Sequence, residues 1–255
     1  MSALVEINDL TKYFDIGQDQ IVHAVDGVSL SINSKEVVGL VGESGSGKST
    51  LGKAVLGLHD KTSGNVSFAG QVLPQKYRSK DFQSRAQQMQ MIFQDPYSSL
   101  NPRMTVGEII GEGLKLNKDI DAEEISQRVD HWLSLVGLSA EHKSRYPHEF
   151  SGGQRQRIGI ARALILEPDF VVCDEPISAL DVSVQAQVVN LLAELKESMG
   201  LTLLFIAHDL SMVRYISDRM AVMYLGGLVE VGDADDVFFD PLHPYTKTLI
   251  ASNPE

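Results

Sequence analysis

The sequence predicts an α/β fold with a mostly parallel sheet, an antiparallel β subdomain at the N-terminus and an inserted helical subdomain. Two continuous apolar runs, residues 170–173 and 203–207, alternate with helical segments. Strands that are apolar at every position are typical of parallel sheets covered by helices on both faces. Short strand-like runs dominate residues 1–41, whereas residues 101–151 have helical periodicity and no obvious parallel strand.

Each element is predicted from a local pattern of apolar residues and turn signals. Strands are expected over residues 4–7, 23–32 and 37–41, a helix after Lys48, strand-and-turn structure over 61–93, helices over 101–151 and 151–166, a strand over 170–173, a helix over 181–200 and a strand over 203–207. Glu167-Pro168 ends one of these helices and Gly200 ends another, as helix C-termini commonly do.

Composition narrows the class of protein. The chain has 255 residues, 43% of them hydrophobic, which is enough for a sizeable core. Its net charge of -12 and pI near 5.0 argue against nucleic-acid binding, which needs a basic face. The single cysteine, Cys173, excludes an intramolecular disulfide and a cysteine-cluster metal site. Without a secretory signal or a membrane-length apolar run, we expect a soluble, cytoplasmic chain that reaches a membrane through a partner.

Residues 42–49, GESGSGKS, match the phosphate-binding pattern GxxxxGK[ST] between an apolar strand and a helix. Their glycines let the backbone wrap round a polyphosphate with N–H groups pointing inward, and the helix N-terminus adds partial positive charge. We expect Lys48 to reach the β- and γ-phosphates and the Ser49 hydroxyl to ligate Mg²⁺. The flanking strand and helix favour a nucleoside triphosphate site over a chance glycine-rich turn.

Two adjacent carboxylates, Asp174 and Glu175, follow the apolar run 170–173. Ligands bind at the carboxyl ends of strands in open parallel sheets, so we expect Asp174 to lie beside the phosphate loop and to serve Mg²⁺ directly or through water. Glu175 lies one step further out and suits a general base that polarises the attacking water. Pro176 restricts the backbone of Glu175 and should help to fix its carboxylate.

A second glycine-rich helix start, Ser151-Gly152-Gly153-Gln154, precedes the acidic strand by about one helix. In isolation it reads as an N-cap serine and a turn. Beside the phosphate loop, it makes the chain resemble the nucleotide-binding subunit of an ATP-binding cassette (ABC) transporter, whose signature motif is Ser-Gly-Gly-Gln. The resemblance implies two subunits arranged head to tail, each pointing its signature helix at the γ-phosphate held by the other.

Four further positions match motifs of this family. Gln94 occupies the position that senses Mg²⁺ and links the sheet to the helical insert. Asp181, in Ser178-Ala179-Leu180-Asp181, matches the D-loop and is also a good N-cap. His208 matches the histidine that contacts the γ-phosphate, and Tyr13 matches the aromatic that stacks on adenine. A half-buried strand tyrosine is an equal alternative for Tyr13.

The resemblance therefore implies a complete set of site residues. These are the catalytic residues Lys48, Glu175 and His208; the nucleotide contacts Tyr13, Gly42, Glu43, Ser44, Gly45, Ser46, Gly47, Lys48, Ser49, Thr50, Gln94 and Asp174; the Mg²⁺ ligands Ser49, Gln94 and Asp174; and the in-trans signature Ser151, Gly152, Gly153 and Gln154. One nucleotide-binding domain is expected over residues 1–255. Its core and β subdomain would occupy roughly 1–93 and 151–240, its helical subdomain roughly 94–165, and a short C-terminal segment 241–255.

Three segments are most similar to the F-type ATPase of dipeptide and oligopeptide importers: FQDPYSSLNPR at 93–103, RYPHEF at 145–150 and His243-Pro244-Tyr245-Thr246. That resemblance implies ATP and Mg²⁺ as cofactors, a second ATPase of the D type, two permease subunits and an extracytoplasmic substrate-binding protein. It also implies a peripheral position on the cytoplasmic face of the inner membrane. The subgroup often continues into a cysteine-rich extension with an iron–sulfur cluster, and no such cluster is expected in this chain, which has no cysteine after Cys173.

Other classes explain the sequence less well. A soluble ABC ATPase of DNA repair, chromosome organisation or translation would carry zinc modules, long coiled-coil insertions or a second cassette. A phosphate-loop kinase or GTPase would leave residues 151–154 unexplained. The sequence thus favours the ATPase subunit of a peptide importer, with oligosaccharides and nickel as alternative cargoes of the same architecture.

Overall fold

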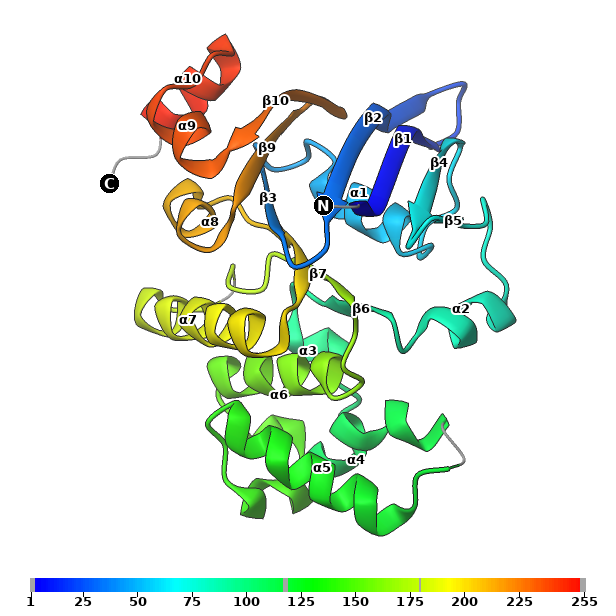
Figure 1. Ribbon diagram of the computed structural model, residues 1–255, viewed down its shortest axis with the longest axis vertical. Coiled ribbons are helices and arrows are strands. Elements are labelled where there is room, and N and C mark those ends of the chain that lie inside the picture. The colour runs from blue at the N-terminus through cyan, green and yellow to red at the C-terminus, as the bar shows by residue number, and fades with distance from the viewer. Residues whose placement is uncertain (1–2, 117–118, 179, 253–255) are drawn as a thin grey trace. The chain divides into compact units, whose positions relative to one another are not determined.

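The computed structural model describes residues 3–116, 119–178 and 180–252 (Figure 1). The chain divides into two compact units: residues 1–84 with 200–255, called the first unit below, and residues 85–199, called the second unit. Each unit has its own buried apolar side chains and is described separately. Among the described residues, no helix has the length and apolar character needed to cross a membrane.

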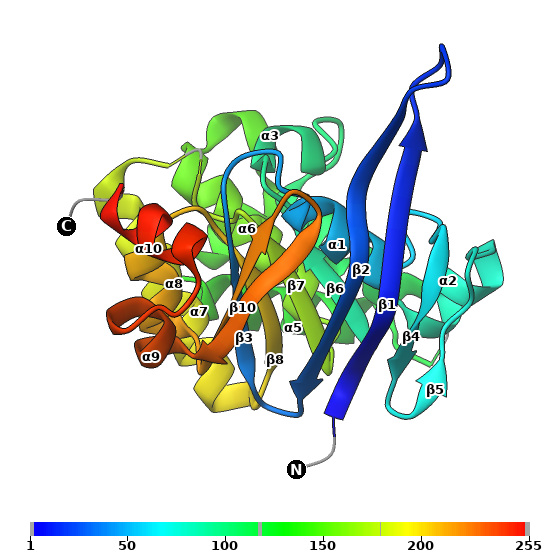
Figure 2. The ribbon, with the colours of Figure 1, turned by 90° about the horizontal axis from the view of Figure 1, so that it is seen from above.

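The first unit contains an antiparallel sheet of order β2-β1-β4-β5. Its strands are β1 (Ala3–Asp15), β2 (Ile21–Asn33), β4 (Ser63–Phe68) and β5 (Gln71–Val72). Along β1 the buried residues Val5, Ile7 and Leu10 alternate with more exposed ones, as in a sheet with one face on a core. β1 and β2 form a long ribbon (Figure 2) in which Tyr13 lies opposite His23.

A second group of strands in the first unit has the order β10-β9-β3-β8. These are β3 (Val37–Val41), β8 (Thr202–Ile206), β9 (Arg219–Tyr224) and β10 (Gly227–Asp233). β3 pairs in parallel with both β8 and β9, and every residue of β3 and β8 is buried. β10 returns antiparallel to β9. β3 ends at Val41, and the phosphate loop begins at the next residue, Gly42.

Four helices accompany these strands: α1 (Lys48–Val55), α8 (Leu210–Ile216), α9 (Ala234–Phe239) and α10 (Pro244–Ala251). α8 approaches β3 so closely that a Cβ on Gly39 would collide with Val213 and Ser217. α9 packs against β9 and β10, as Figure 2 shows. α2 (Ser79–Arg85) lies where the chain passes from the first unit to the second.

The second unit combines a parallel pair of strands, β6 (Met89–Ile92) and β7 (Phe170–Asp174), with helices. The helices are α3 (Pro96–Ser99), α4 (Val106–Gly111), η1 (Gly113–Leu116), α5 (Ala122–Leu135), η2 (Ala140–Ser144), η3 (Pro147–Glu149), α6 (Gly152–Leu164) and α7 (Val182–Met199). Apolar residues at helical spacing on α4 and α5, such as Ile110, Val129 and Leu133, are buried.

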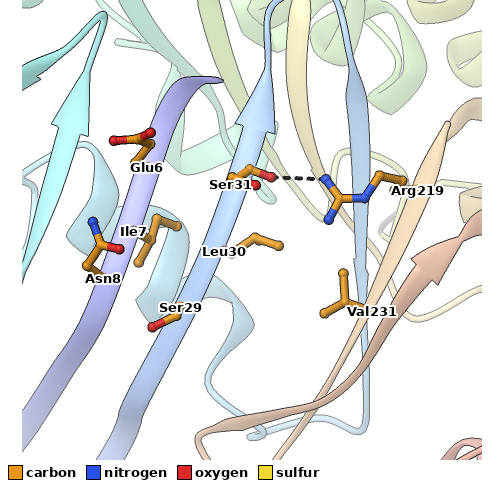
Figure 3. Close-up of a pocket in the computed structure, with 8 residues that line it drawn as sticks. All are labelled: Glu6, Ile7, Asn8, Ser29, Leu30, Ser31, Arg219 and Val231. Atoms are coloured by element: carbon orange, nitrogen blue, oxygen red, sulfur yellow. Dashed lines mark hydrogen bonds between the residues drawn. The ribbon is translucent and has the colours of Figure 1, made fainter. Parts of the chain in front are cut away.

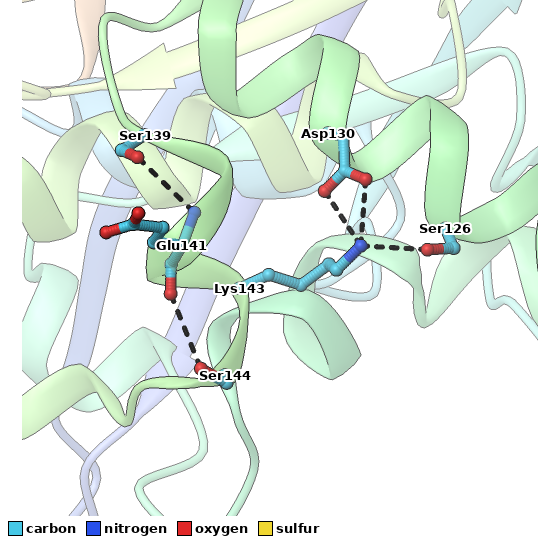
Figure 4. Close-up of polar contacts among 6 residues, drawn as sticks. All are labelled: Ser126, Asp130, Ser139, Glu141, Lys143 and Ser144. Atoms are coloured by element: carbon cyan, nitrogen blue, oxygen red, sulfur yellow. Dashed lines mark hydrogen bonds and ion pairs between the residues drawn. The ribbon is translucent and has the colours of Figure 1, made fainter.

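A lysine joins two elements of the helical part. Lys143 of η2 donates to the Ser126 hydroxyl and to the Asp130 carboxylate of α5, each at 2.8 Å (Figure 4). Ser139 caps η2 by accepting from the amide of Glu141 at 3.3 Å. The pair Lys143–Asp130 is about one-third exposed, so it serves to orient η2 on α5 and contributes little free energy.

The structure confirms the predicted fold class: parallel pairs among the apolar strands, an antiparallel N-terminal sheet and helices between β6 and β7. The strand-and-turn prediction for residues 61–93 missed α2, which has no buried residue and therefore no apolar periodicity. β1 extends to Asp15, well beyond the predicted residues 4–7, because β2 pairs with it along its whole length.

Candidate functional site

The phosphate loop connects β3 to α1 through a turn that only glycine accommodates at two positions. Gly42 and Gly47 have φ of +150° and +104°. A Cβ on Gly42 would collide with the carbonyl oxygen of Met223, and one on Gly47 with that of Ala24. The loop is thus seated directly against the backbone of β2 and β9, and side chains at these glycines would displace it.

Lys48, the first residue of α1, folds back over the loop. Its side chain is 4% exposed, and its ammonium donates to the carbonyl oxygens of Gly42 and Glu43 at 2.8 Å each. Gly47 is the N-cap of α1 and provides no side-chain cap, so the first amides of the helix are directed at the loop. A lysine ammonium beside uncapped helix amides favours an anion such as a phosphate.

Two contacts from distant segments hold the loop from outside. The amide of Gly226, in the turn between β9 and β10, donates to the carbonyl of Ser46 at 3.0 Å. The amide of Glu43 donates to the hydroxyl of Tyr245, on α10, also at 3.0 Å. Sequence reasoning did not find either contact. In the sequence, His243-Pro244-Tyr245-Thr246 indicates a family resemblance and does not predict a contact of the tyrosine with the phosphate loop.

Two other predicted residues lie in the first unit. Tyr13 stacks on His23, with ring centroids 4.0 Å apart and planes at 22°, and its hydroxyl donates to Asp26 at 2.5 Å. This hydrogen bond to a carboxylate raises the pKa of Tyr13. His208 is exposed and follows β8 by two residues, next to Asp209, whose side chain caps α8. His23 covers one face of the Tyr13 ring, and the contact of Tyr13 with adenine stays a prediction.

The acidic strand end lies in the second unit. Asp174 ends β7 and is 2% exposed, whereas Glu175 is partly exposed. Glu175 has φ of +45°, so the extended backbone that a following proline favours is not what this residue adopts. Such a left-handed φ costs a non-glycine residue about 1–2 kcal/mol. The Glu175 carbonyl accepts from the hydroxyl and amide of Ser178, at 3.2 and 3.3 Å, and this turn sustains the strained conformation.

Gln94 forms a hydrogen bond with Glu175, the predicted general base. Its side-chain amide donates to the carboxylate of Glu175 at 2.9 Å, across 81 positions of sequence. Gln94 follows β6 and Glu175 follows β7, and these strands are parallel neighbours, so both side chains leave the same edge. A donor at this distance orients the carboxylate.

The signature residues begin α6 as a capping box. The amide of Gln154 donates to the Ser151 hydroxyl at 3.3 Å, and the amide of Ser151 donates to the Gln154 side chain at 3.0 Å. Ser151 therefore has the structural role of an N-cap, and the helix end it defines is the anion-attracting end. Asp181 directly precedes α7, and its carbonyl accepts from the amides of Val184 and Gln185. Ala179 of the predicted D-loop lies outside the described residues.

The donors predicted for Mg²⁺ are a hydroxyl on Ser49, an amide oxygen on Gln94 and a carboxylate on Asp174. Hard oxygen donors of this kind suit Mg²⁺, which in phosphate sites takes one or two protein ligands and completes its shell with phosphate and water. Across the described part of the chain, no group of three or more His, Cys, Asp or Glu side chains is arranged to hold a metal ion. The donor chemistry of each residue suits Mg²⁺, and the Mg²⁺ site stays a prediction.

A pocket of roughly 430 Å³ lies elsewhere in the first unit, along β1, β2, β9 and β10 (Figure 3). Its lining includes Asn8, Ser31 and Arg219, and none of the phosphate-loop residues is among its lining residues. The Arg219 guanidinium donates to the Ser31 carbonyl and pairs with Glu36, each at 3.1 Å. Arg219 therefore ties β9 to β2, and this pocket is separate from the candidate site.

Comparison with known proteins identifies the family. Residues 25–178 match the family model described as ABC transporter, and residues 229–255 match that of the oligopeptide/dipeptide transporter C-terminal region. The chain belongs to the ABC transporter family. As a member of it, this chain binds and hydrolyses ATP.

Relatives of this ABC transporter ATPase agree in sequence and structure. It is 56% identical over 252 residues to the oligopeptide transport ATP-binding protein OppF of Bacillus subtilis, covering 98% of this chain and 82% of that protein. It is 54% identical over 252 residues to AmiF, an oligopeptide transport ATP-binding protein of Streptococcus pneumoniae, with the same coverage. A solved dimer of the ATP-binding cassette MJ0796 with ADP and Pi has a TM-score of 0.83 and 28% identity, covering 90% of this chain and 98% of that chain.

Proposed function

We propose that this ABC transporter ATPase uses ATP hydrolysis to drive the import of di- and oligopeptides. The observation that carries the ATPase part of the proposal is the phosphate loop, where buried Lys48 is held at the carbonyls of Gly42 and Glu43 at the start of α1. The match of residues 229–255 and the names of OppF and AmiF support peptides as cargo. Oligosaccharides and nickel are the alternative cargoes.

In the proposed reaction, backbone amides of the phosphate loop and of the first turn of α1, other than that of Glu43, and the Lys48 ammonium bind the phosphates. Ser49, Gln94 and Asp174 would hold Mg²⁺, which neutralises negative charge on the phosphate oxygens when bound. Glu175 takes the proton of the attacking water as general base, with its carboxylate oriented by the Gln94 amide. His208 contacts the γ-phosphate, and Tyr13 stacks on adenine.

The assembly that we propose follows from the signature helix. Ser151, Gly152, Gly153 and Gln154 would act on ATP held by a second ATPase subunit of the D type, where the start of α6 meets the γ-phosphate. Two permease subunits and an extracytoplasmic binding protein would complete the importer, and they would select the cargo. This chain would then lie at the cytoplasmic face of the plasma membrane through its permease partners, without contact to nucleic acid.

A matched pair of variants tests the general base. Glu175→Gln should leave ATP binding unchanged and reduce hydrolysis by about 10²–10⁴-fold, the contribution of a positioned base. Glu167→Gln is the control, because Glu167 also precedes a proline and has a left-handed φ, of +51°, but lies at the opposite end of β7. Binding is measured by calorimetry and hydrolysis by phosphate release. Normal turnover of Glu175→Gln would show that another group activates the water.

The cargo is tested with the complete transporter. The chain is reconstituted in vesicles with its permeases, its partner ATPase and its binding protein, and uptake of a labelled tripeptide is compared with that of maltotriose and Ni²⁺. We expect ATP-dependent uptake of the tripeptide alone. Uptake of maltotriose or Ni²⁺ without uptake of the peptide would replace the proposed cargo and leave the ATPase assignment intact.

A further inference from the structure

The C-terminal helix α10 reaches the phosphate loop through one hydroxyl. Tyr245 Oη accepts the amide proton of Glu43 at 3.0 Å, across 202 positions of sequence. On the other side of the loop, Lys48 donates to the carbonyl of Gly42 at 2.8 Å. The N–H of Glu43 and the C=O of Gly42 belong to one planar peptide group, so Tyr245 and Lys48 hold the same group at its two ends.

The orientation of this peptide group matters for Lys48. In a trans peptide the N–H and the C=O point in opposite directions, so an N–H directed at Tyr245 directs the Gly42 carbonyl at the lysine. Gly42, at φ of +150°, is a residue at which a peptide reorients with little steric resistance. A reversed peptide would present its N–H to the Lys48 ammonium, which is unfavourable because both are donors. The Tyr245 hydroxyl therefore opposes that reversal.

The tyrosine is held firmly enough to act in this way. Its ring packs on Tyr224 of β9, with centroids 4.2 Å apart and planes at 38°. Its own amide donates to the His243 side chain at 3.2 Å, which caps α10. Glu230 of β10 accepts from the amides of Leu242 and His243, at 2.7 and 3.0 Å. The start of α10 is thus tied to β9 and β10 before the hydroxyl meets the loop.

The environment keeps the hydroxyl protonated. Burial raises the pKa of Tyr245, and the nearby Glu43 carboxylate and Tyr224 raise it further, in opposition to the hydrogen bond from the Glu43 amide. The group is then a neutral phenol across the physiological pH range, and its oxygen accepts from the amide without placing a negative charge beside a loop that binds phosphates.

We propose that Tyr245 is a positioning residue for ATP binding and hydrolysis: its hydroxyl fixes the Gly42–Glu43 peptide, and through it Lys48, and so couples nucleotide at the phosphate loop to docking of α10. The proposal rests on the proposed function of that loop. It predicts coupling in both directions, since two events that share one hydrogen-bonded network affect each other by the same factor.

The test removes one oxygen atom from the 255-residue chain. Tyr245→Phe keeps the ring on Tyr224 and deletes the hydroxyl, and Tyr224→Phe is the matched control that deletes the neighbouring hydroxyl of the same stack. We expect Tyr245→Phe to raise the Kd for ADP and the KM for ATP by about two- to tenfold, the range of one neutral hydrogen bond. The Tyr224→Phe values should stay within about twofold of wild type. Without nucleotide, Tyr245→Phe should lower the melting temperature by no more than the few degrees that one neutral hydrogen bond contributes.

Hydrogen exchange measured by mass spectrometry distinguishes a positioning role of Tyr245 from a purely structural one, because only a positioning role changes the effect of ADP on exchange. In the wild type, ADP should slow exchange over residues 244–251, and Tyr245→Phe should abolish that effect while speeding exchange over residues 42–47. Unchanged ADP affinity and unchanged exchange in Tyr245→Phe would overturn the proposal. An equal loss of affinity in Tyr224→Phe would also overturn it, because ring packing would then be responsible. A wild-type chain that binds no ADP would instead refute the function of the loop itself.

Discussion

Replacing Gly153 by alanine should destabilise the second unit, whereas the same change at Gly152 should not. Both glycines lie in the first turn of α6. A Cβ on Gly153 would collide with Cγ1 of Val184 on α7, while one on Gly152 would meet Leu180 Cδ2 at 3.5 Å, an ordinary van der Waals contact. Val184 is β-branched and has few alternative rotamers, so it cannot easily move away.

The magnitude follows from comparing the two variants. Inserting a methyl group into a well-packed contact costs about 1–3 kcal/mol. Exchanging glycine for alanine in a helix is favourable by up to about 1 kcal/mol, and this gain is similar at the two adjacent positions. The difference in unfolding free energy between Gly152→Ala and Gly153→Ala should therefore be about 1–3 kcal/mol, equal to the overpacking cost.

The assay is urea denaturation followed by tryptophan fluorescence. Trp132 is the single tryptophan, is 5% exposed and lies in the second unit with both glycines, so its emission reports the unfolding of that unit. Adding Val184→Ala to Gly153→Ala should recover part of the loss, with a coupling energy of about 0.5–3 kcal/mol. Equal stability of the two glycine variants, or no rescue by Val184→Ala, would refute this packing argument. A stable Gly152→Ala chain that no longer hydrolyses ATP together with the proposed partner ATPase would support the proposed action of Gly152 on nucleotide held by that partner.

Two further predictions concern buried and capped groups. Cys173 is fully buried on β7, and burial raises the pKa of its thiol to about 12, so Ellman's reagent should label it only in denaturant; rapid labelling of the native chain would contradict its burial. Burial acts to raise the pKa of Glu230, but hydrogen bonds from the Leu242 and His243 amides lower it below its ordinary value of 4.5. The stability that this carboxylate contributes is then present above about pH 4.5 and lost as pH falls through its lower folded pKa. Melting temperature against pH should show this loss in the wild type, and a Glu230→Gln chain with the same pH dependence would contradict it.

Local patterns predicted the strands that are buried along their whole length and the helix that buries one apolar face. The runs at 37–41, 170–173 and 203–207 correspond to β3, β7 and β8, and the helix expected over 181–200 is α7. Continuous burial leaves a continuous apolar pattern, so these strands are readable from sequence. α2 buries no residue and left no such pattern.

Part of the site was less predictable. Pro176 indicated a restricted Glu175, but the left-handed φ depends on the turn that Ser178 closes. Tyr13 was a candidate for adenine, and only the register of β1 with β2 shows that His23 already covers one face of its ring. Both features depend on neighbours whose positions local propensity does not encode.

The sequence by itself determined the class of machine, because its decisive motifs are contiguous. Residues 42–49 form one contiguous motif, and residues 151–154 form another. Because each motif lies next to a predicted strand or helix, the sequence is enough to predict that its backbone amides bind phosphate. Only the tertiary structure decided which residues support those motifs. Tyr245 meets Glu43 across 202 positions, and Val184 gives Gly153 its packing role, because these contacts exist only once helices and strands have packed.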